Sequence, residues 1–283
     1  LEEYAIPEPT EQPVYPDNCE GLTINGDIKL FVAGDPNSDT VVYYFSGNGA
    51  TCDSIRKHIA EIPSSVLSVG FNIGNYNSAS DQTSDPTLSS FIRAFAGITT
   101  SSTEGGVATI ARQEYISQFD ALEAEIEEKT RAAMPGLTGA APFDLLRLGQ
   151  NQPRNKKRIM IYHSGGYQTF HNMFRAGFFD SGVSVVLGVF LADCLYSGRV
   201  NEEAIELASR RDIWYTNMFA AHISSADPEP GSGRGSEDFN SRFRAAGGVS
   251  VSEFDRTIDR GSNHSSVPSD YAAYAIRLFT GNV

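Results

Sequence analysis

Short apolar runs recur along the chain, and turn residues separate them. Within residues 21–33, two runs of alternating apolar and polar residues flank Asn25-Gly26, a dipeptide typical of tight hairpin turns. This pattern predicts an N-terminal β-hairpin. The next predicted elements are a strand over 40–45, a helix over 53–61 and a strand over 64–72. A glycine-rich turn at 46–49 follows the first of them, and this succession of strand, turn, helix and strand indicates a parallel α/β sheet.

The second half of the chain repeats this alternation. It predicts strands over 158–162, 183–191, 212–219 and 249–254, and helices over 167–178, 202–210 and 269–280. Ser269 is a suitable N-cap for the last helix, and residues 224–238 are rich in Gly, Pro and Ser, as in a loop. We expect a three-layer α/β sandwich with a mostly parallel central sheet and the N-terminal hairpin.

A long stretch, residues 75–155, separates the two halves. It contains one helical pattern, over 113–133, between segments rich in Ser, Thr, Gly and Pro. Connections in compact domains are typically about 4–6 residues long, so the stretch predicts an insertion or lid over a site, with surface decoration as the alternative. We expect residues 18–283 to form a single domain, preceded by a Pro-rich acidic leader over 1–17.

Charge and hydropathy narrow the range of partners. The chain of 283 residues carries a formal net charge of −13, which argues against nucleic acid, because phosphate binding needs clustered Lys and Arg. No apolar run approaches the roughly 18 residues that span a bilayer. A small-molecule or acyl-ester substrate is the expected partner, and the sequence does not specify an oligomeric state.

The three cysteines are Cys19, Cys52 and Cys194, with no CxxC pair, so we expect no structural zinc site. An odd number leaves at least one thiol free or paired between chains, and a disulfide between Cys19 and Cys52 is one arrangement. The leader over 1–17 is typical of the tether of an exported protein. We therefore expect a periplasmic or extracellular location, with the cytoplasm as the alternative.

One serine has the setting of a nucleophile. The strand over 158–162 runs into His163-Ser164-Gly165-Gly166, and a helix follows directly. A sharp strand-to-helix turn strains the serine backbone and exposes the hydroxyl above the sheet edge, and it needs small neighbours. A serine hydroxyl also needs a general base, a carboxylate that orients the base, and donors for the oxyanion.

The segment Tyr162-His163-Ser164-Gly165-Gly166 resembles the nucleophile elbow, G-x-S-x-G, of the α/β-hydrolase family. The departure is Tyr162, which occupies the position of the first glycine. The resemblance implies a serine hydrolase that cleaves a carboxylic ester, or an amide or thioester, through an acyl-enzyme on Ser164, without a metal or organic cofactor. A non-catalytic binding module of the same fold is the alternative.

The resemblance also assigns the partners of the serine. His264 precedes the last helix, as the family's catalytic histidine does, and His222 is its only rival. Asp193, just past the strand over 183–191, is the expected acid, because catalytic groups gather at such strand ends. Asp227, in the loop after the next strand, is the alternative acid.

For the oxyanion hole, the resemblance implies the backbone N–H groups of Asn48 and Gly165, with Gly49 in place of Asn48 if the loop is shifted by one. A competing hypothesis is a nucleotide-dependent enzyme, since residues 47–52 begin like the dinucleotide motif G-x-G-x-x-G. They end in Cys52, however, and no acidic residue closes the next strand to bind a ribose.

Overall fold

The structure is a computed structural model. It describes residues 22–24, 28–35, 38–47, 50–71, 98–99, 108–109, 125–126, 128–129, 157–175, 177–180, 186–195, 198–210, 217–222, 237–252 and 264–281. The predicted leader and most of the predicted insertion lie outside these residues. Of the helix expected over 113–133, residues 125–126 and 128–129 are described, and all four are helical.

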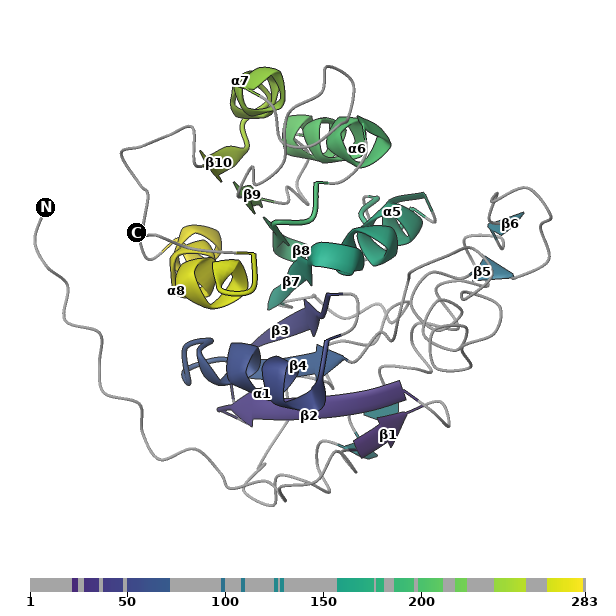
Figure 1. The fold of residues 1–283 in the computed structure, drawn as a ribbon, viewed down its shortest axis with the longest axis vertical. Helices are drawn as coiled ribbons and strands as arrows, with labels where there is room; N and C mark the ends of the chain where they lie inside the picture. Colours follow the sequence, from purple (N-terminus) through teal and green to yellow (C-terminus); the bar gives the residue numbers. More distant parts are fainter. Residues whose placement is uncertain are drawn as a thin grey trace, which may run out of the picture.

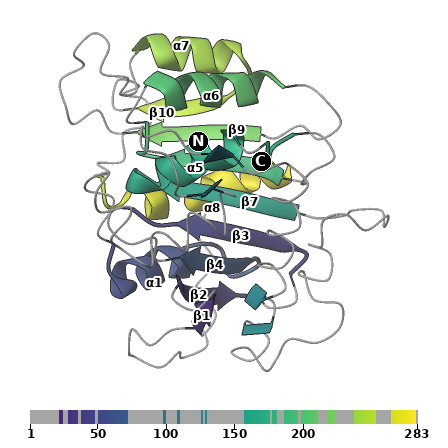
Figure 2. The same cartoon turned by 90° about the vertical axis from the view of Figure 1, so that its right-hand side faces the viewer.

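Among the described residues, eight strands form one sheet in the order β1-β2-β4-β3-β7-β8-β9-β10 (Figure 2). All pairs from β4 to β10 are parallel, whereas β2 runs antiparallel to both β1 and β4. The strands are β1 (Leu22–Ile24), β2 (Ile28–Gly34), β3 (Thr40–Phe45), β4 (Leu67–Phe71), β7 (Lys157–His163), β8 (Val186–Ala192), β9 (Asn217–His222) and β10 (Val249–Ser252). A separate antiparallel pair joins β5 (Ile98–Thr99) to β6 (Ala108–Thr109). The expected α/β fold with a mostly parallel sheet is confirmed.

Helices cover both faces of the sheet (Figures 1 and 2). One apolar core lies between the sheet and α1 and α8, and a second lies between the sheet and α5, α6 and α7. The helical elements are α1 (Cys52–Ala60), the 3₁₀ turn η2 (Ser164–Gly166), α5 (Tyr167–Arg175), α6 (Gly198–Ser209), α7 (Glu237–Ala245) and α8 (Val267–Thr280). None of the described helices is long and apolar enough to cross a membrane.

Strand β3 shows why the central strands are nearly continuous apolar runs. All six of its residues are buried. Val41, Tyr43 and Phe45 belong to the core under α5–α7, and Val42 and Tyr44 belong to the core under α1 and α8. A strand with helices on both faces has no solvent-facing side, so apolar residues fill both sets of alternating positions.

The start of α8 differs from the prediction. Ser266, rather than Ser269, is the N-cap residue, and its hydroxyl donates to Asp270 Oδ2 at 2.7 Å instead of capping a backbone N–H. Pro268 lies in the first turn, where its missing N–H costs no helical hydrogen bond. The helix ends at Gly281, whose φ of 73° is the left-handed conformation that glycine adopts most easily.

Helix α7 is absent from the sequence prediction, which placed a loop up to residue 238 and a strand from 249. Phe239 and Phe243, one turn apart, are buried, and their rings stack at 5.1 Å. Arg242 on the outer face contacts Glu202 of α6 with its two terminal nitrogens at 2.7 and 2.5 Å. The helix is therefore held mainly by one aromatic pair, with the ion pair on its exposed side.

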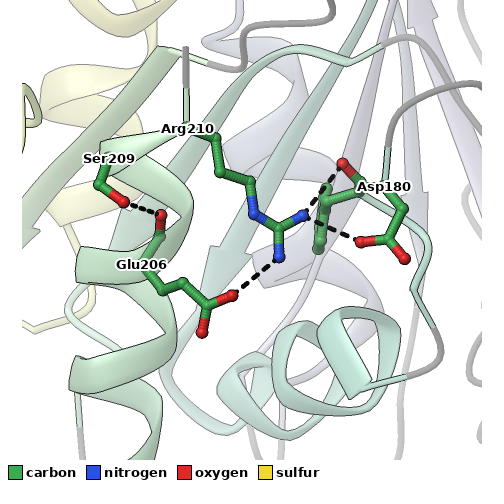
Figure 3. A network of polar contacts seen from close by, with 5 residues as sticks. Asp180, Glu206, Ser209 and Arg210 are labelled. Atoms are coloured by element: carbon green, nitrogen blue, oxygen red, sulfur yellow. Dashed lines mark hydrogen bonds and ion pairs between the residues drawn. The ribbon is translucent and has the colours of Figure 1, made fainter. Parts of the chain in front are cut away.

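Arg210, just after α6, ties this helix to the turn that follows α5 (Figure 3). Its guanidinium donates to Asp180 Oδ1 at 3.0 Å and to Glu206 Oε1 at 3.1 Å, and it lies 5.1 Å from the centre of the Phe174 ring. The two carboxylates are well exposed, so each ion pair contributes little to stability. The contacts link the end of α6 to the end of α5, the helix that follows Ser164.

The structure describes two of the three cysteines. Cys52, the first residue of α1, is disulfide-bonded, and Cys194 is a buried free thiol. Cys19, the third cysteine of the chain, lies outside the described residues.

Candidate active site

Ser164 lies at the turn where strand β7 ends and the η2–α5 helical segment begins. Its φ is 49°, and among the described non-glycine residues only Ser164 and Asp193 have a positive φ. A non-glycine residue in this region carries strain and persists only where the surrounding structure imposes it. The serine therefore has the sharp strand-to-helix turn that the sequence predicts.

Two glycines let the neighbouring strand approach this turn. A Cβ added to Gly47, just after β3, would lie 2.8 Å from Ser164 Cβ. A Cβ added to Gly166 would lie 2.9 Å from the carbonyl oxygen of Phe45, the last residue of β3. Both contacts are too short for a real side chain. Gly47, the first glycine of the segment that begins like a dinucleotide motif, is thus in contact with the serine.

Tyr162, which occupies the motif's first glycine position, is fully buried. Its ring stacks on Phe45 with centroids 4.8 Å apart and an interplanar angle of 9°, and it meets the edge of Phe170 at 5.6 Å. Its hydroxyl donates to Met173 Sδ at 3.2 Å. Phe170 and Met173 belong to α5, so the tyrosine is packed between sheet and helix and the turn is formed around it.

The structure brings Ser164, His264 and Asp193 together. His264 Nε2 lies 3.0 Å from Ser164 Oγ, and His264 Nδ1 lies 2.5 Å from Asp193 Oδ2. A carboxylate only accepts, so Nδ1 carries the proton and donates to Asp193, which leaves Nε2 to accept from the serine hydroxyl. A serine, a base and an orienting carboxylate in one hydrogen-bonded chain have the geometry of nucleophile activation.

The elements that hold these three side chains meet at the carboxyl ends of β7 and β8. Asp193 follows β8 directly, and its backbone N–H donates to Ala221 of β9 at 2.7 Å. Its side chain is 10% exposed, whereas that of His264, just before α8, is 41% exposed. The carboxylate is thus embedded in protein, and the imidazole faces solvent on one side.

Gly165, which follows the serine, is buried in η2. Asn48, Gly49 and the alternative acid Asp227 lie outside the described residues, so their predicted roles stay predictions. His222, the rival base, is the last residue of β9. Within the described part of the chain, no group of three or more His, Cys, Asp or Glu side chains is arranged to hold a metal ion.

Cys194, beside Asp193, is unsuited to act as a second nucleophile. It is completely buried. Burial, and secondarily the negative charge of Asp193, raises the pKa of its thiol well above the ordinary value. Because the thiolate is the reactive form, this thiol is inert at neutral pH. It contributes to the core that lies under α5–α7.

A buried network adjoins the site, and no pattern in the sequence indicates it. Tyr44, His58 and His163 are all buried. The Tyr44 hydroxyl lies 2.6 Å from His58 Nδ1 and 3.3 Å from His163 Nδ1. The two Nε2 atoms point to the chain around the base: His58 Nε2 lies 2.8 Å from the Ser265 carbonyl oxygen, and His163 Nε2 lies 2.9 Å from that of His264.

The three side chains of this network are uncharged at neutral pH. Burial is the main cause that lowers the pKa of His163 to about 3, and it also lowers the pKa of His58. Burial raises the pKa of the Tyr44 hydroxyl. The network therefore consists of two neutral imidazoles and one protonated phenol.

A scan against models of known protein families and a search of curated proteins found no match. Among solved structures, the chain is similar to a carboxylesterase of Bacillus cereus, at 11% identity and a TM-score of 0.38, over 81% of this chain and 84% of that chain. It is also similar to brefeldin A esterase, a bacterial homologue of human hormone-sensitive lipase, at 11% identity and a TM-score of 0.38, over 99% of this chain and 77% of that chain. At this level of similarity, neither structure bears on what this chain acts on.

Proposed function

We propose that the protein is a serine hydrolase of the α/β-hydrolase type, which cleaves a carboxylic ester through an acyl-enzyme on Ser164. The observation that carries the proposal is the hydrogen-bonded chain from Ser164 through His264 to Asp193, with the serine at a positive φ between a strand and a helix. The order Ser, Asp, His along the chain agrees with that of this family.

The reaction follows from the proton positions. Ser164 Oγ attacks the substrate carbonyl carbon as its proton passes to His264 Nε2, and Asp193 stabilises the resulting imidazolium through Nδ1. The Nε2 proton then passes to the leaving alkoxide, and the C–O bond of the ester breaks. Water repeats the sequence on the acyl-enzyme: His264 takes its proton and later returns it to Ser164, releasing the acid.

The oxyanion formed in both steps needs two donors. The N–H of Gly165, at the first turn of the helical segment, is the proposed first donor, and the N–H of Asn48, in the turn after β3, is the proposed second. The contact of Gly47 with Ser164 supports a donor from this turn. The partial positive charge at a helix N-terminus also favours the developing anion.

Hydrolysis of p-nitrophenyl esters of increasing acyl length tests the proposal. We expect kcat to fall by roughly a thousandfold or more in Ser164→Ala and in His264→Ala, since members of such a unit act together. We expect kcat to fall strongly in Asp193→Asn and to stay at the wild-type value in Asp227→Asn. Ser209→Ala, an exposed serine on α6, is the matched control.

Covalent labelling with a fluorophosphonate probe separates a hydrolase from a binding module of the same fold. A hydrolase labels once per chain, and Ser164→Ala abolishes the label. Turnover or labelling that survives in Ser164→Ala would refute the nucleophile assignment. A folded wild-type protein that neither labels nor hydrolyses any of the esters would favour the binding module.

Export of the protein is part of the proposal, and the disulfide at Cys52 supports it. Structural disulfides persist in oxidising compartments and are rare in the cytosol. Alkylation of the denatured protein from its native source, counted by mass spectrometry, is expected to modify only Cys194 before reduction and all three cysteines afterwards. Recovery of the protein from the cytoplasm with Cys52 reduced would contradict export.

A further inference from the structure

Two consecutive backbone carbonyls, those of His264 and Ser265, are each in contact with a histidine from a different element. The Ser265 carbonyl meets His58 of α1 at 2.8 Å, and the His264 carbonyl meets His163 of β7 at 2.9 Å. A carbonyl oxygen can only accept, so the Nε2 atom of each histidine carries a proton and donates it. The tautomer of both imidazoles is thereby fixed.

Tyr44 completes this arrangement. With Nε2 protonated, Nδ1 of each neutral imidazole is an acceptor, and the single phenolic proton of Tyr44 goes to the nearer one, that of His58 at 2.6 Å. His163 Nδ1, at 3.3 Å, makes the longer contact with the same hydroxyl. The phenol therefore holds His58 in the tautomer that donates to Ser265.

The side chain of His264 packs on one side against the ring of His163, with centroids 4.9 Å apart, and it needs further support. It is 41% exposed, and it is directed by its hydrogen bonds to Ser164 and Asp193. Its backbone, in contrast, is tied to His163, the residue that immediately precedes Ser164. His163, at the end of β7, thus holds the main chain of His264, and Ser164, the next residue, contacts its side chain.

We propose that Tyr44, His58 and His163 form a positioning network that anchors the carbonyls of His264 and Ser265 and so keeps the His264 imidazole within hydrogen-bonding distance of Ser164. Of the three, His163 also contacts the base itself, through its ring and the His264 carbonyl. The inference rests on the proposed function in one respect: a displaced imidazole slows acyl transfer only if His264 is the base.

The test compares two substitutions at His58. Gln places an amide N–H near the position of Nε2 and can still donate to the Ser265 carbonyl, whereas Leu fills similar space without a donor. Since a misplacement of about 1 Å in catalytic groups costs roughly a hundredfold in rate, we expect His58→Leu to lower kcat for p-nitrophenyl acetate by about ten- to a hundredfold with KM unchanged. His58→Gln is expected to restore most of kcat.

His171→Leu is the control for lost stability. His171 of α5 is paired with Glu203 of α6 at 2.8 Å, away from the network, so its loss lowers the melting temperature without moving His264. We expect full kcat in this variant. A kcat for His58→Leu equal to that of wild type, in a folded protein, would overturn the inference, as would equal losses in the Leu and Gln variants.

Ser164→Ala, measured first, separates the inference from the proposed function. If wild-type turnover does not depend on Ser164, the proposed function has failed, and long-range ¹H–¹⁵N spectra of ¹⁵N-histidine-labelled protein then decide the inference. The network predicts Nε2–H tautomers for His58 and His163, and His264 signals that change in His58→Leu but stay unchanged in His58→Gln and His171→Leu. His264 signals that are the same in all four proteins would overturn it.

Discussion

Acid should destabilise the folded protein through His163. The residue is 6% exposed, and its pKa is lowered to about 3 from the ordinary 6.5, first by burial. Between these two values the unfolded chain carries a proton on His163 that the folded chain does not accept. Stability rises with pH wherever the unfolded state binds more protons, so it falls as pH drops through this window.

The magnitude follows from the width of the window. One histidine contributes a slope of about 1.4 kcal/mol per pH unit below the ordinary pKa, so the loss attributable to His163 reaches roughly 3 kcal/mol two units below that value. His58, whose pKa is also lowered chiefly by burial, adds a slope of the same sign. Together they are a large fraction of the roughly 5–15 kcal/mol that stabilises a typical domain.

Urea unfolding at 25 °C between about pH 7.5 and 4 measures this slope. His163→Gln keeps a donor near Nε2 and cannot take up a proton, so between about pH 6 and 4 its stability should fall less steeply than that of wild type, by about 1.4 kcal/mol per pH unit. The carboxylates are the same in both proteins, so their contribution cancels when one slope of stability against pH is subtracted from the other. Equal slopes in the two proteins would show that His163 titrates normally and would refute the reasoning.

Three further predictions concern neighbouring features. Gly47→Ala places a Cβ 2.8 Å from that of Ser164, so fluorophosphonate labelling should slow at least tenfold; an unchanged rate would contradict the contact. Tyr44→Phe removes the donor to His58 and should lower the free energy of unfolding by about 1–3 kcal/mol in urea, the cost of a buried acceptor without a partner; no loss would show that this bond is absent in solution. Reducing the Cys52 disulfide with dithiothreitol should cost about 2–5 kcal/mol by the same measure, and identical urea midpoints would exclude a stabilising role.

Hydrophobic periodicity predicted the fold, and the elements that differ from the prediction do so for local reasons. The apolar run at β3 predicted that strand to the residue, because burial on both faces makes the run from Val41 to Phe45 continuous. Helix α7 was missed because its apolar face consists of Phe239 and Phe243 alone, between polar residues and after a glycine-rich segment. The N-cap of α8 was placed three residues late because Pro268 obscured the first turn.

The sequence likewise indicated some residues of the site and missed others. Ser164 has a motif around it, and Asp193 and His264 stand at element ends, where the resemblance to the α/β-hydrolase family implied that the three residues meet. The network behind them left no such signal. His58 was assigned only to a helix and His163 only to the motif, because their partners are backbone carbonyls, which any residue type supplies, and the contacts span 207 and 101 positions of the chain.

The chain leaves the sheet at Phe71, the end of β4, and returns at Lys157, the start of β7. Closing a long connection costs entropy that grows only with the logarithm of its length, so doubling it adds roughly 0.6 kcal/mol. The proposed reactive side chains and their positioning network all come from other parts of the chain. Ile126, in the described part of this connection, is buried in the core. Away from it, a change in the length of the connection therefore adds little loop-closure entropy, which would let the connection vary in length while the same chemistry persists.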